Sequence, residues 1–346
     1  MAWTINNGSL FMNPTLYTGN GSTQSINVGF QPDFTWIKTR SGTTGTEGHR
    51  LQDAVRGSTK YLESNGTAQE GTQAQGVTSF TSTGFNLGTD GSYNYNTAPI
   101  VSWNWKAGTT SGIVQGGASI TPSAYSFNQT SGFSIIKYQG TGANATVPHG
   151  LNAVPKMILF KSLANSISWI VYSSQLNISS SNCLRLNGTN AAFTESAWND
   201  TRPTTSVFSL GPHNEANNSS GETIAYCFAD VQGFSKMGSY VGNGSTNGTF
   251  VYTGFKPAFV LYKKSSGTEN WFMHDNKRQG YNPDNEYLFP DLSNAEGSLN
   301  RINLLSNGFK ATTSDGGING SGATYIFMAF AENPITSSTG VPSTAR

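Results

Sequence analysis

Internal repetition constrains this chain more than any other feature of its sequence. Three segments of the 346 residues open alike, with Tyr-x-Gly-x-Gly at Tyr17, Tyr138 and Tyr240. Each continues through a polar stretch, a Gly-Phe or Gly-Leu pair and a proline to an apolar run that ends in lysine. The lysines are Lys38, Lys161 and Lys263, and the prolines are Pro32, Pro155 and Pro257. This self-similarity predicts three copies of one structural unit, each of about 100 residues.

Each copy closes on an apolar stretch with a period of two, which is typical of β-strands. In PIVSWNWK, Val101, Trp103 and Trp105 share one face, and polar residues share the other. The run Tyr325 to Ala331 (YIFMAFA) is apolar on both faces, which predicts a strand buried between two layers. The strand tryptophans that we expect in the core are Trp103, Trp105, Trp169 and Trp271.

The composition fits many short strands joined by polar turns. Gly, Asn, Ser and Thr make up 155 of the 346 residues, charged residues only 11% and aromatic residues 12%. Pairs such as Asn65-Gly66 and Asp90-Gly91 supply the positive φ angles that tight hairpins need. No stretch predicts a helix of more than two turns. The expected fold class is all-β, with three tandem antiparallel β-sandwiches of the jelly-roll kind.

The repeats predict a division of the chain into three sandwiches and two connecting or terminal segments. The sandwiches are expected at residues 1–107, 132–230 and 231–335. Residues 108–131, which begin GTTSGIVQGG, are rich in Gly, Ser and Thr and are predicted to form a linker. Residues 336–346 are expected to form a polar C-terminal tail.

Several classes of protein are disfavoured. The formal net charge of +1 without basic clusters argues against a nucleic-acid binder. The longest apolar run is far shorter than the roughly 20 residues of a membrane helix, so membrane insertion is not expected. The start, MAWTINNGSL, shows no secretion signal. Cys183 and Cys227 form no disulfide framework, and Cys227 is expected to be a small buried hydrophobe.

The sequence shows no catalytic constellation, and we assign no catalytic residue. Zinc-protease, paired-cysteine, EF-hand and nucleophile-elbow motifs are all missing from it. The densest acidic stretch, HDNKRQGYNPDNEYLFPD, carries Asp275, Asp284 and Glu286. Their oxygen atoms are ligands that calcium prefers, so the three residues form a candidate metal site. The competing interpretation is a solvated loop that holds no cofactor.

Aromatic residues in turn-rich surroundings offer a route to carbohydrate binding. The C–H faces of sugars match apolar rings, while Asn, Asp and Gly-rich loops supply hydrogen bonds to hydroxyl groups. Loops can also tuck an aromatic ring beneath themselves, so both outcomes stay open for these residues. The candidate sugar-binding residues are Tyr93, Tyr95, Trp198, Tyr281 and Tyr287.

The repeat frame, together with GHRLQDAVRG (Gly48 to Gly57) and SWNWKAG (Ser102 to Gly108), resembles the repeats of marine bacteriophage structural proteins. These are concanavalin-like, lectin-like modules on tail fibres and other virion appendages. The second repeat departs from the pattern, since it lacks the GHRLQD segment. The resemblance implies a non-enzymatic virion protein that is assembled in the host cytoplasm and contacts other virion proteins and copies of itself.

Three functions therefore compete at this point. The first is a surface structural protein of a bacteriophage particle, as an appendage or head decoration, with adhesion to the host surface. The second is a tail-fibre receptor-binding lectin that recognises host polysaccharide. The third is a polysaccharide-degrading enzyme on a jelly-roll scaffold. The start of the first repeat near Met1 and the lack of heptads favour a compact appendage or decoration protein over a full-length fibre.

Overall fold

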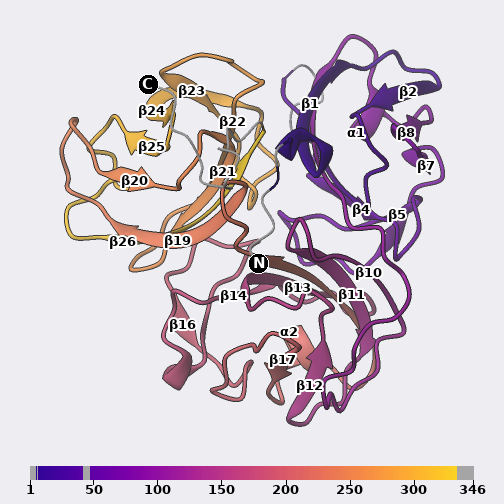
Figure 1. The fold of residues 1–346 in the computed structure, drawn as a ribbon. Helices are drawn as coiled ribbons and strands as arrows, with labels where there is room; N and C mark the ends of the chain where they lie inside the picture. Colours follow the sequence, from indigo (N-terminus) through magenta and orange to yellow (C-terminus); the bar gives the residue numbers. More distant parts are fainter. Residues whose placement is uncertain (1–4, 6, 42–46, 333–346) are drawn as a thin grey trace.

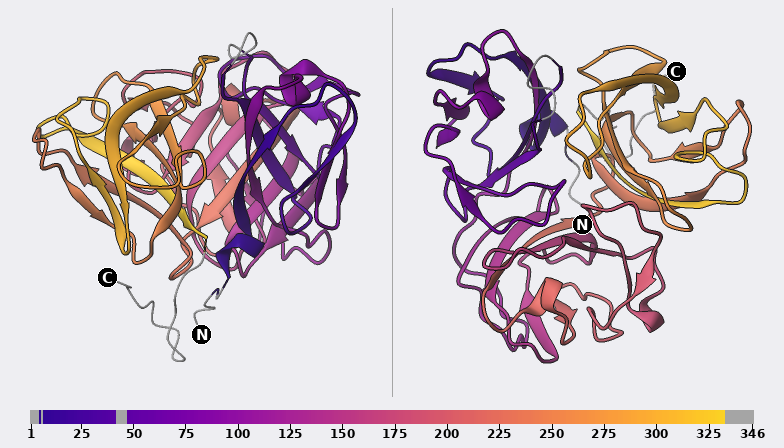
Figure 2. Two further views of the ribbon diagram at one scale, coloured as in Figure 1. Left: turned by 90° about the horizontal axis from the view of Figure 1, so that it is seen from above. Right: turned by 180° about the vertical axis from the view of Figure 1, so that it is seen from behind.

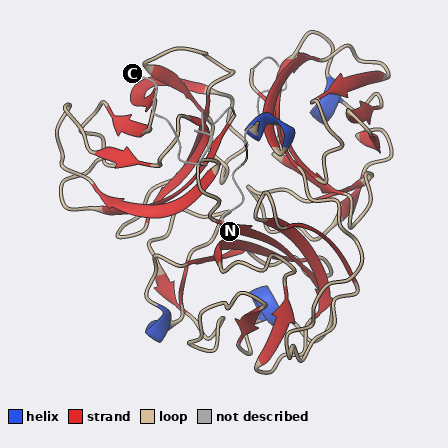
Figure 3. Cartoon of the chain, viewed as in Figure 1, coloured by secondary structure: helices blue, strands red, loops and turns tan. Residues whose placement is uncertain are grey.

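Three lobes surround a common centre (Figure 1), and the same arrangement is clear from behind (Figure 2). The computed structural model describes residue 5, residues 7–41 and residues 47–332. We call residues 8–107 lobe 1, residues 108–230 lobe 2 and residues 231–332 lobe 3. Strands dominate all three lobes, and the helices are single turns (Figure 3).

Lobe 1 has an inner sheet of order β1-β9-β3-β4, an outer sheet of order β2-β8-β7 and a small β5-β6 hairpin. All pairings are antiparallel. Its elements are η1 (Gly8–Leu10), β1 (Met12–Thr18), β2 (Gln24–Asn27), β3 (Phe34–Thr39), β4 (Arg50–Asp53), β5 (Lys60–Tyr61), β6 (Gly71–Thr72), β7 (Val77–Thr81), β8 (Gly84–Leu87), α1 (Gly91–Asn94) and β9 (Pro99–Trp105).

Lobe 2 repeats this inner order as β11-β18-β13-β14 and extends it at one edge by β10. Two short pairs, β12-β17 and β15-β16, form its other layer. Its elements are β10 (Ala124–Asn128), β11 (Phe133–Gln139), β12 (Ala145–Pro148), β13 (Pro155–Ser162), β14 (Ile170–Ser173), η2 (Ile178–Ser180), β15 (Asn182–Cys183), β16 (Phe193–Thr194), β17 (Val207–Leu210), α2 (Asn214–Asn217) and β18 (Glu222–Ala229).

Lobe 3 has an inner sheet of order β19-β26-β21-β22 and an outer sheet of order β20-β25-β24-β23. As in lobe 1, the last strand of the lobe lies second in the inner sheet, between the first strand and β21. Its elements are β19 (Ser235–Val241), β20 (Phe250–Tyr252), β21 (Pro257–Lys264), β22 (Trp271–Asp275), β23 (Asp284–Tyr287), β24 (Gly297–Leu305), β25 (Gly308–Ala311) and β26 (Thr324–Ala331).

The inner strands bury both faces, as their period-two patterns predicted. In β26, Ile326, Met328 and Phe330 belong to a core shared by all three lobes, whereas Tyr325 and Phe327 belong to the core of lobe 3 alone. The prediction that YIFMAFA lies between two layers is therefore confirmed. The four tryptophans predicted for the core are also buried, each with at most 1% of its surface exposed. Three of them lie in strands, whereas Trp169 directly precedes β14.

Three equivalent aromatic residues meet at the centre of the molecule. Trp105, Phe228 and Phe330 occupy the same register position on the closing strands of the three lobes. Their ring centroids lie 6.3, 5.9 and 6.0 Å apart, all in edge-to-face geometry. The lobes thus surround an approximate threefold axis that passes through this triangle.

The Tyr-x-Gly-x-Gly motif has the same structural role in each lobe. The hydroxyl groups of Tyr17, Tyr138 and Tyr240 donate to backbone carbonyls 2.5–2.9 Å away, on the segment just before the closing strand. The first glycine of each motif lies so close to the backbone of that segment that a side chain would collide with it. The second has φ of +67° to +68°, a conformation that favours glycine. Backbone geometry therefore explains why the motif recurs.

Two further predictions concern the connecting segments. Residues 124–128, inside the predicted linker 108–131, form strand β10 and pair with β11, so this part of the linker belongs to a sheet. The predicted tail, residues 336–346, lies outside the described residues. The all-β, antiparallel class is confirmed, and helices α1 and α2 are four residues each.

Candidate functional site

The structure divides the five predicted sugar-binding aromatics into buried and exposed residues. Tyr95 and Tyr281 are exposed, with 43% and 72% of their surface accessible. Tyr93, Trp198 and Tyr287 are buried, so the expectation that they present rings to a ligand is wrong.

Each of the three buried rings has a structural partner. Tyr93 lies in α1, and its hydroxyl bonds to the side chain of Gln52. The Trp198 indole donates to the Asn182 carbonyl at 3.2 Å, beneath the loop that carries it. Tyr287 ends strand β23, so it belongs to a sheet and not to a loop, and its ring packs edge-to-face against Phe289 with the centroids 5.1 Å apart.

The predicted metal ligands do not come together. Asp275 is fully buried and pairs with Arg278 at 2.7 Å, while Glu286 pairs with Arg40 at 2.9 Å. The side chain of Asp284 lies outside the described residues. Among the residues that the structure describes, no group of three or more His, Cys, Asp or Glu side chains could hold a metal ion. The described residues therefore give the calcium hypothesis no support.

The Asp275–Arg278 pair instead connects two lobes. Trp103 of lobe 1 donates its indole N–H to the Asp275 carboxylate at 3.0 Å. Burial raises the pKa of Asp275, but Arg278 and two backbone N–H groups outweigh burial and lower the pKa below its ordinary value. The carboxylate thus stays ionised inside the protein, where charge pairing and hydrogen bonds compensate for the lost hydration.

The same arrangement recurs between lobes 1 and 2. Asp53 and Arg56 pair at the end of β4, and Tyr226 of lobe 2 donates its hydroxyl to Asp53 at 2.7 Å. The equivalent positions at the end of β14 hold Ser173 and Leu176. Lobe 2 therefore has no Asp–Arg pair at its junction with lobe 3. The lobe 3 residue equivalent to Trp103 and Tyr226 is the apolar Met328, which belongs to the shared core.

A second cyclic set of bonds joins the lobes. In each lobe, one side chain at or directly before the start of β4, β14 or β22 bonds to a backbone carbonyl of the preceding lobe at 2.8–2.9 Å. The bonds join Trp169 to Glu63, Trp271 to Arg185, and His49 to Phe289. Since the last of these connects lobe 1 to lobe 3, the ring of lobes is closed.

The repeated lysines are also structural. Lys38, Lys161 and Lys263 are fully buried, and each ammonium group donates to backbone carbonyls at 2.6–3.4 Å. Lys161 reaches the carbonyl of Thr67 in lobe 1 at 3.0 Å. Burial lowers the pKa of all three to about 8. Their carbonyl partners account for the lysine that ends each apolar run.

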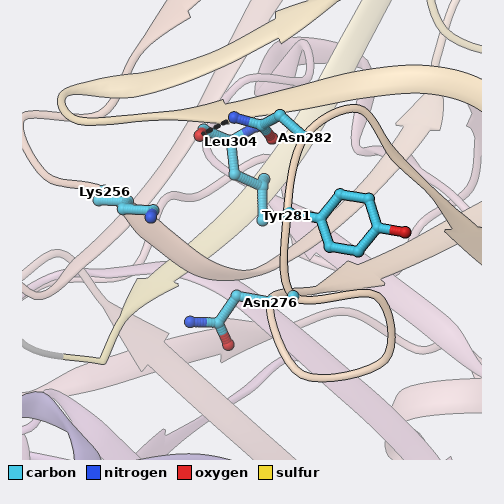
Figure 4. Close-up of a pocket in the computed structure, with 6 residues that line it drawn as sticks. Lys256, Asn276, Tyr281, Asn282 and Leu304 are labelled. Atoms are coloured by element: carbon cyan, nitrogen blue, oxygen red, sulfur yellow. Dashed lines mark hydrogen bonds between the residues drawn. The ribbon is translucent and has the colours of Figure 1, made fainter.

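Tyr281 borders a small hollow in lobe 3 (Figure 4). The Asn282 side chain donates to the Leu304 carbonyl and accepts from its N–H, both at 2.8 Å, and this holds the loop in place. In Figure 4 the Tyr281 ring lies on the opposite side of the hollow from Lys256. The volume of about 40 Å³ suits water and is too small for a sugar. Tyr281 is therefore an isolated exposed ring.

A larger polar hollow opens in lobe 2, with a volume of about 330 Å³. Three of its lining residues, Ser181, Asn199 and Asp200, have left-handed backbone conformations with φ of 44° to 50°. The Ser181 hydroxyl donates to the Asp200 carboxylate at 2.6 Å, which ties the two loops together. The lining is formed by Asn144, Ser179, Ser181, Thr194, Glu195, Ser196, Asn199, Asp200 and Pro212.

This polar hollow is the candidate binding site of the protein. Its hydroxyl, amide and carboxylate groups match the hydroxyl groups of a sugar, and strained backbone of this kind often occurs at functional sites. The sequence prediction for Trp198 identified the right segment, SAWND, but the residues of it that line the hollow are Ser196, Asn199 and Asp200. Thr194 and Glu195 directly precede this segment. The fold brings the other lining residues from more distant positions: Asn144, Ser179, Ser181 and Pro212.

The fold and the bonding between lobes define a closed, three-lobed, all-β protein. The chain belongs to the family described as Domain of unknown function (DUF7483), whose model matches residues 7–334. Searches of curated proteins and of solved structures found no significant match. Within the described part of the chain, every helix is too short to span a lipid bilayer.

Proposed function

We propose that this protein is a non-enzymatic structural subunit on the surface of a bacteriophage particle, as an appendage or head decoration, with a role in adhesion to the host. The resemblance of its repeats to virion modules supports this proposal. The triangle of Trp105, Phe228 and Phe330 is the observation that carries it. Three lobes locked around one apolar centre make a rigid body suited to display on a particle.

We also propose that each lobe is one copy of a concanavalin-like jelly roll. The recurring inner-sheet order and the recurring roles of the tyrosine, glycine and lysine positions support this interpretation. In such an arrangement the inner sheets bond the lobes together, and the outer layers and loops are left for contacts with other virion proteins, further copies of the chain or host glycans.

Locating the protein on the particle tests the structural role. Antibodies raised against the purified protein are expected to label intact particles of the phage that encodes it, at a fixed position in electron micrographs. An antibody against a known capsid protein of the same particle is the matched control. Failure to label particles, with the protein found only in lysate, would contradict a virion role.

The enzymatic alternative rests on Glu195 and Asp200, which both line the polar hollow. Most glycoside hydrolases use two carboxylates that flank the bond to be cleaved. We expect no release of reducing ends from host polysaccharide by the wild-type protein. Depolymerisation that the double variant Glu195→Gln/Asp200→Asn abolishes would overturn the non-enzymatic proposal. A tail-fibre position on the particle would instead favour the receptor-binding lectin.

A further inference from the structure

The outer sheet of lobe 3 carries two exposed aromatic rings on one strand. Phe250 and Tyr252 of β20 expose 43% and 57% of their surface, while Val251 between them is buried. Residues two apart on a strand point to the same face, about 7 Å apart along it. The two rings therefore form one continuous surface, which we call the aromatic platform.

The equivalent positions of the other lobes carry no aromatic side chain. Lobe 1 has Ser25 and Asn27, which pair with Asn86 and Gly84 as Phe250 and Tyr252 pair with Lys310 and Gly308. Lobe 2 has Thr146 and Pro148 on β12. The scaffold thus tolerates small or polar residues here, and the rings of lobe 3 are not needed to complete a sheet of this kind.

The platform lies against β25 and is bordered by positive charge. The Cε2 atom of the Phe250 ring lies 3.1 Å from the position that a Cβ at Gly308 would take, so one edge of the ring lies close to β25. Lys310 is the cross-strand neighbour of Phe250, and its ammonium group bonds to Asn247. Lys236 places its ammonium group 5.3 Å from the centre of the Tyr252 ring.

We propose that the aromatic platform binds an anionic polysaccharide, a deduction that rests on the host-adhesion part of the proposed function. Sugar rings would stack on Phe250 and Tyr252, while carboxylate or sulfate groups would face Lys310 and Lys236. A protein partner fits less well, because lysine is depleted in protein interfaces. Two rings that are about half exposed also offer only about 150–250 Å² of surface, against the roughly 600 Å² that each partner of a stable complex buries.

The decisive variant gives strand β20 of lobe 3 the two residues found at the equivalent positions of lobe 1. Phe250→Ser/Tyr252→Asn installs the residues that the equivalent strand already carries, and Val114→Asn, which removes an exposed apolar side chain of lobe 2, is the control. Binding is measured by affinity electrophoresis against a soluble polyuronate, a sulfated galactan and a neutral glucan. We expect the wild type and the control to bind at least one anionic polymer, and the double variant to bind it about tenfold or more weakly.

A second variant tests the charge. Lys310→Gln is expected to weaken binding to the anionic polymer about threefold at low salt and to leave any binding to the neutral glucan unchanged, because the lost contact is electrostatic. Unchanged binding by the aromatic double variant would overturn the platform and leave adhesion at another site. Failure of the wild type to bind any of the three polymers would overturn the platform and the adhesive role together. A change in oligomeric mass without a change in polysaccharide binding would assign the platform to contacts between copies of the chain.

Discussion

At the scale of single residues, buried polar side chains determine the shape of each lobe. One asparagine per lobe, Asn94, Asn217 or Asn319, is fully buried and holds the Tyr-x-Gly-x-Gly turn against the segment before the closing strand. Asn319 accepts from the Asn243 N–H at 3.0 Å and donates to the carbonyls of Ser245 and Thr313. Both ends of the amide are thus satisfied by backbone groups of two separate loops.

Removal of this amide leaves several buried backbone groups without partners. We expect Asn319→Ala to lower the free energy of unfolding by about 2–4 kcal/mol, as the loss of two or more buried hydrogen bonds implies. Urea denaturation monitored by tryptophan fluorescence measures the change. Asn96→Ala, at an exposed position of lobe 1, is the control and should cost less than about 0.5 kcal/mol. Equal effects of the two substitutions would show that the amide contributes nothing specific.

His149 predicts how stability depends on pH. It is fully buried, accepts from the Leu151 N–H at Nδ1 and contacts the Thr204 carbonyl through Nε2 at 3.1 Å. Burial lowers its pKa to about 4. Because the unfolded chain binds a proton near pH 6.5 and the folded protein does not, the stabilisation is complete above pH 6.5 and is lost as the pH falls towards 4.

The expected loss from His149 at pH 5 is about 2 kcal/mol relative to pH 7. His149→Asn keeps an acceptor for the Leu151 N–H and cannot titrate, so its unfolding free energy should fall less steeply between pH 7 and pH 5. His49, whose pKa burial also lowers, leaves a residual slope in the variant. Denaturation curves at four or five pH values check this, with the partly exposed His213→Asn as the control. Parallel pH profiles for wild type and His149→Asn would refute the linkage.

At the scale of secondary-structure elements, the three equivalent junctions between lobes differ in whether they contain a buried ion pair. Two of the three junctions hold a buried Asp–Arg pair bonded to an aromatic donor, and the third holds Ser173 and Leu176, with the apolar Met328 at the facing position. Buried ion pairs are often replaceable by apolar groups, whereas half of such a pair is strongly destabilising. The three junctions therefore represent two compatible solutions to one packing problem.

This interpretation predicts strong coupling among Asp53, Arg56 and Tyr226. Asp53→Ser alone leaves Arg56 with only its longer ion pair to Glu70, at 3.4 Å, and the Tyr226 hydroxyl without its acceptor, which should cost about 3 kcal/mol. The triple variant Asp53→Ser/Arg56→Leu/Tyr226→Met reproduces the junction that ends in Met328 and should recover most of that loss. Guanidinium denaturation of the single, double and triple variants completes the cycle. A triple variant as unstable as Asp53→Ser would contradict the equivalence of the junctions.

The sequence predicted the inner strands well because local pattern and burial agree there. In β9, Val101, Trp103 and Trp105 form one face by simple alternation, and all three belong to the shared core. The prediction for Tyr287 is wrong because its strand β23 pairs with β24, and nothing local in NPDNEY indicates that partner. The polar hollow likewise depends on which loops the fold brings together. Alternation of apolar and polar residues can be read from a single segment, whereas pairing between distant segments cannot.

At the scale of the whole molecule, one apolar core is shared by the three lobes. The family model spans residues 7–334 and so covers all three lobes together. Ion pairs between Arg40 of lobe 1 and Glu286 and Glu296 of lobe 3 add to the bonds at the junction of the first and last lobes. A lobe on its own would expose the apolar face that its neighbours cover, which is large enough to disfavour a stable isolated lobe.

Cooperative packing predicts a single unfolding transition for the chain. Phe330→Ala opens a cavity in the central triangle and should cost about 3–5 kcal/mol, because the rings of Trp105 and Phe228 lose a packed partner. Since that partner serves all three lobes, calorimetry should show one transition that moves to lower temperature as a whole, with the calorimetric and van't Hoff enthalpies equal. Tyr95→Ala, on an exposed ring, should leave the transition in place. Two or three separable transitions, of which Phe330→Ala moves only one, would show instead that the lobes unfold independently and that the central triangle is only a contact between separate domains.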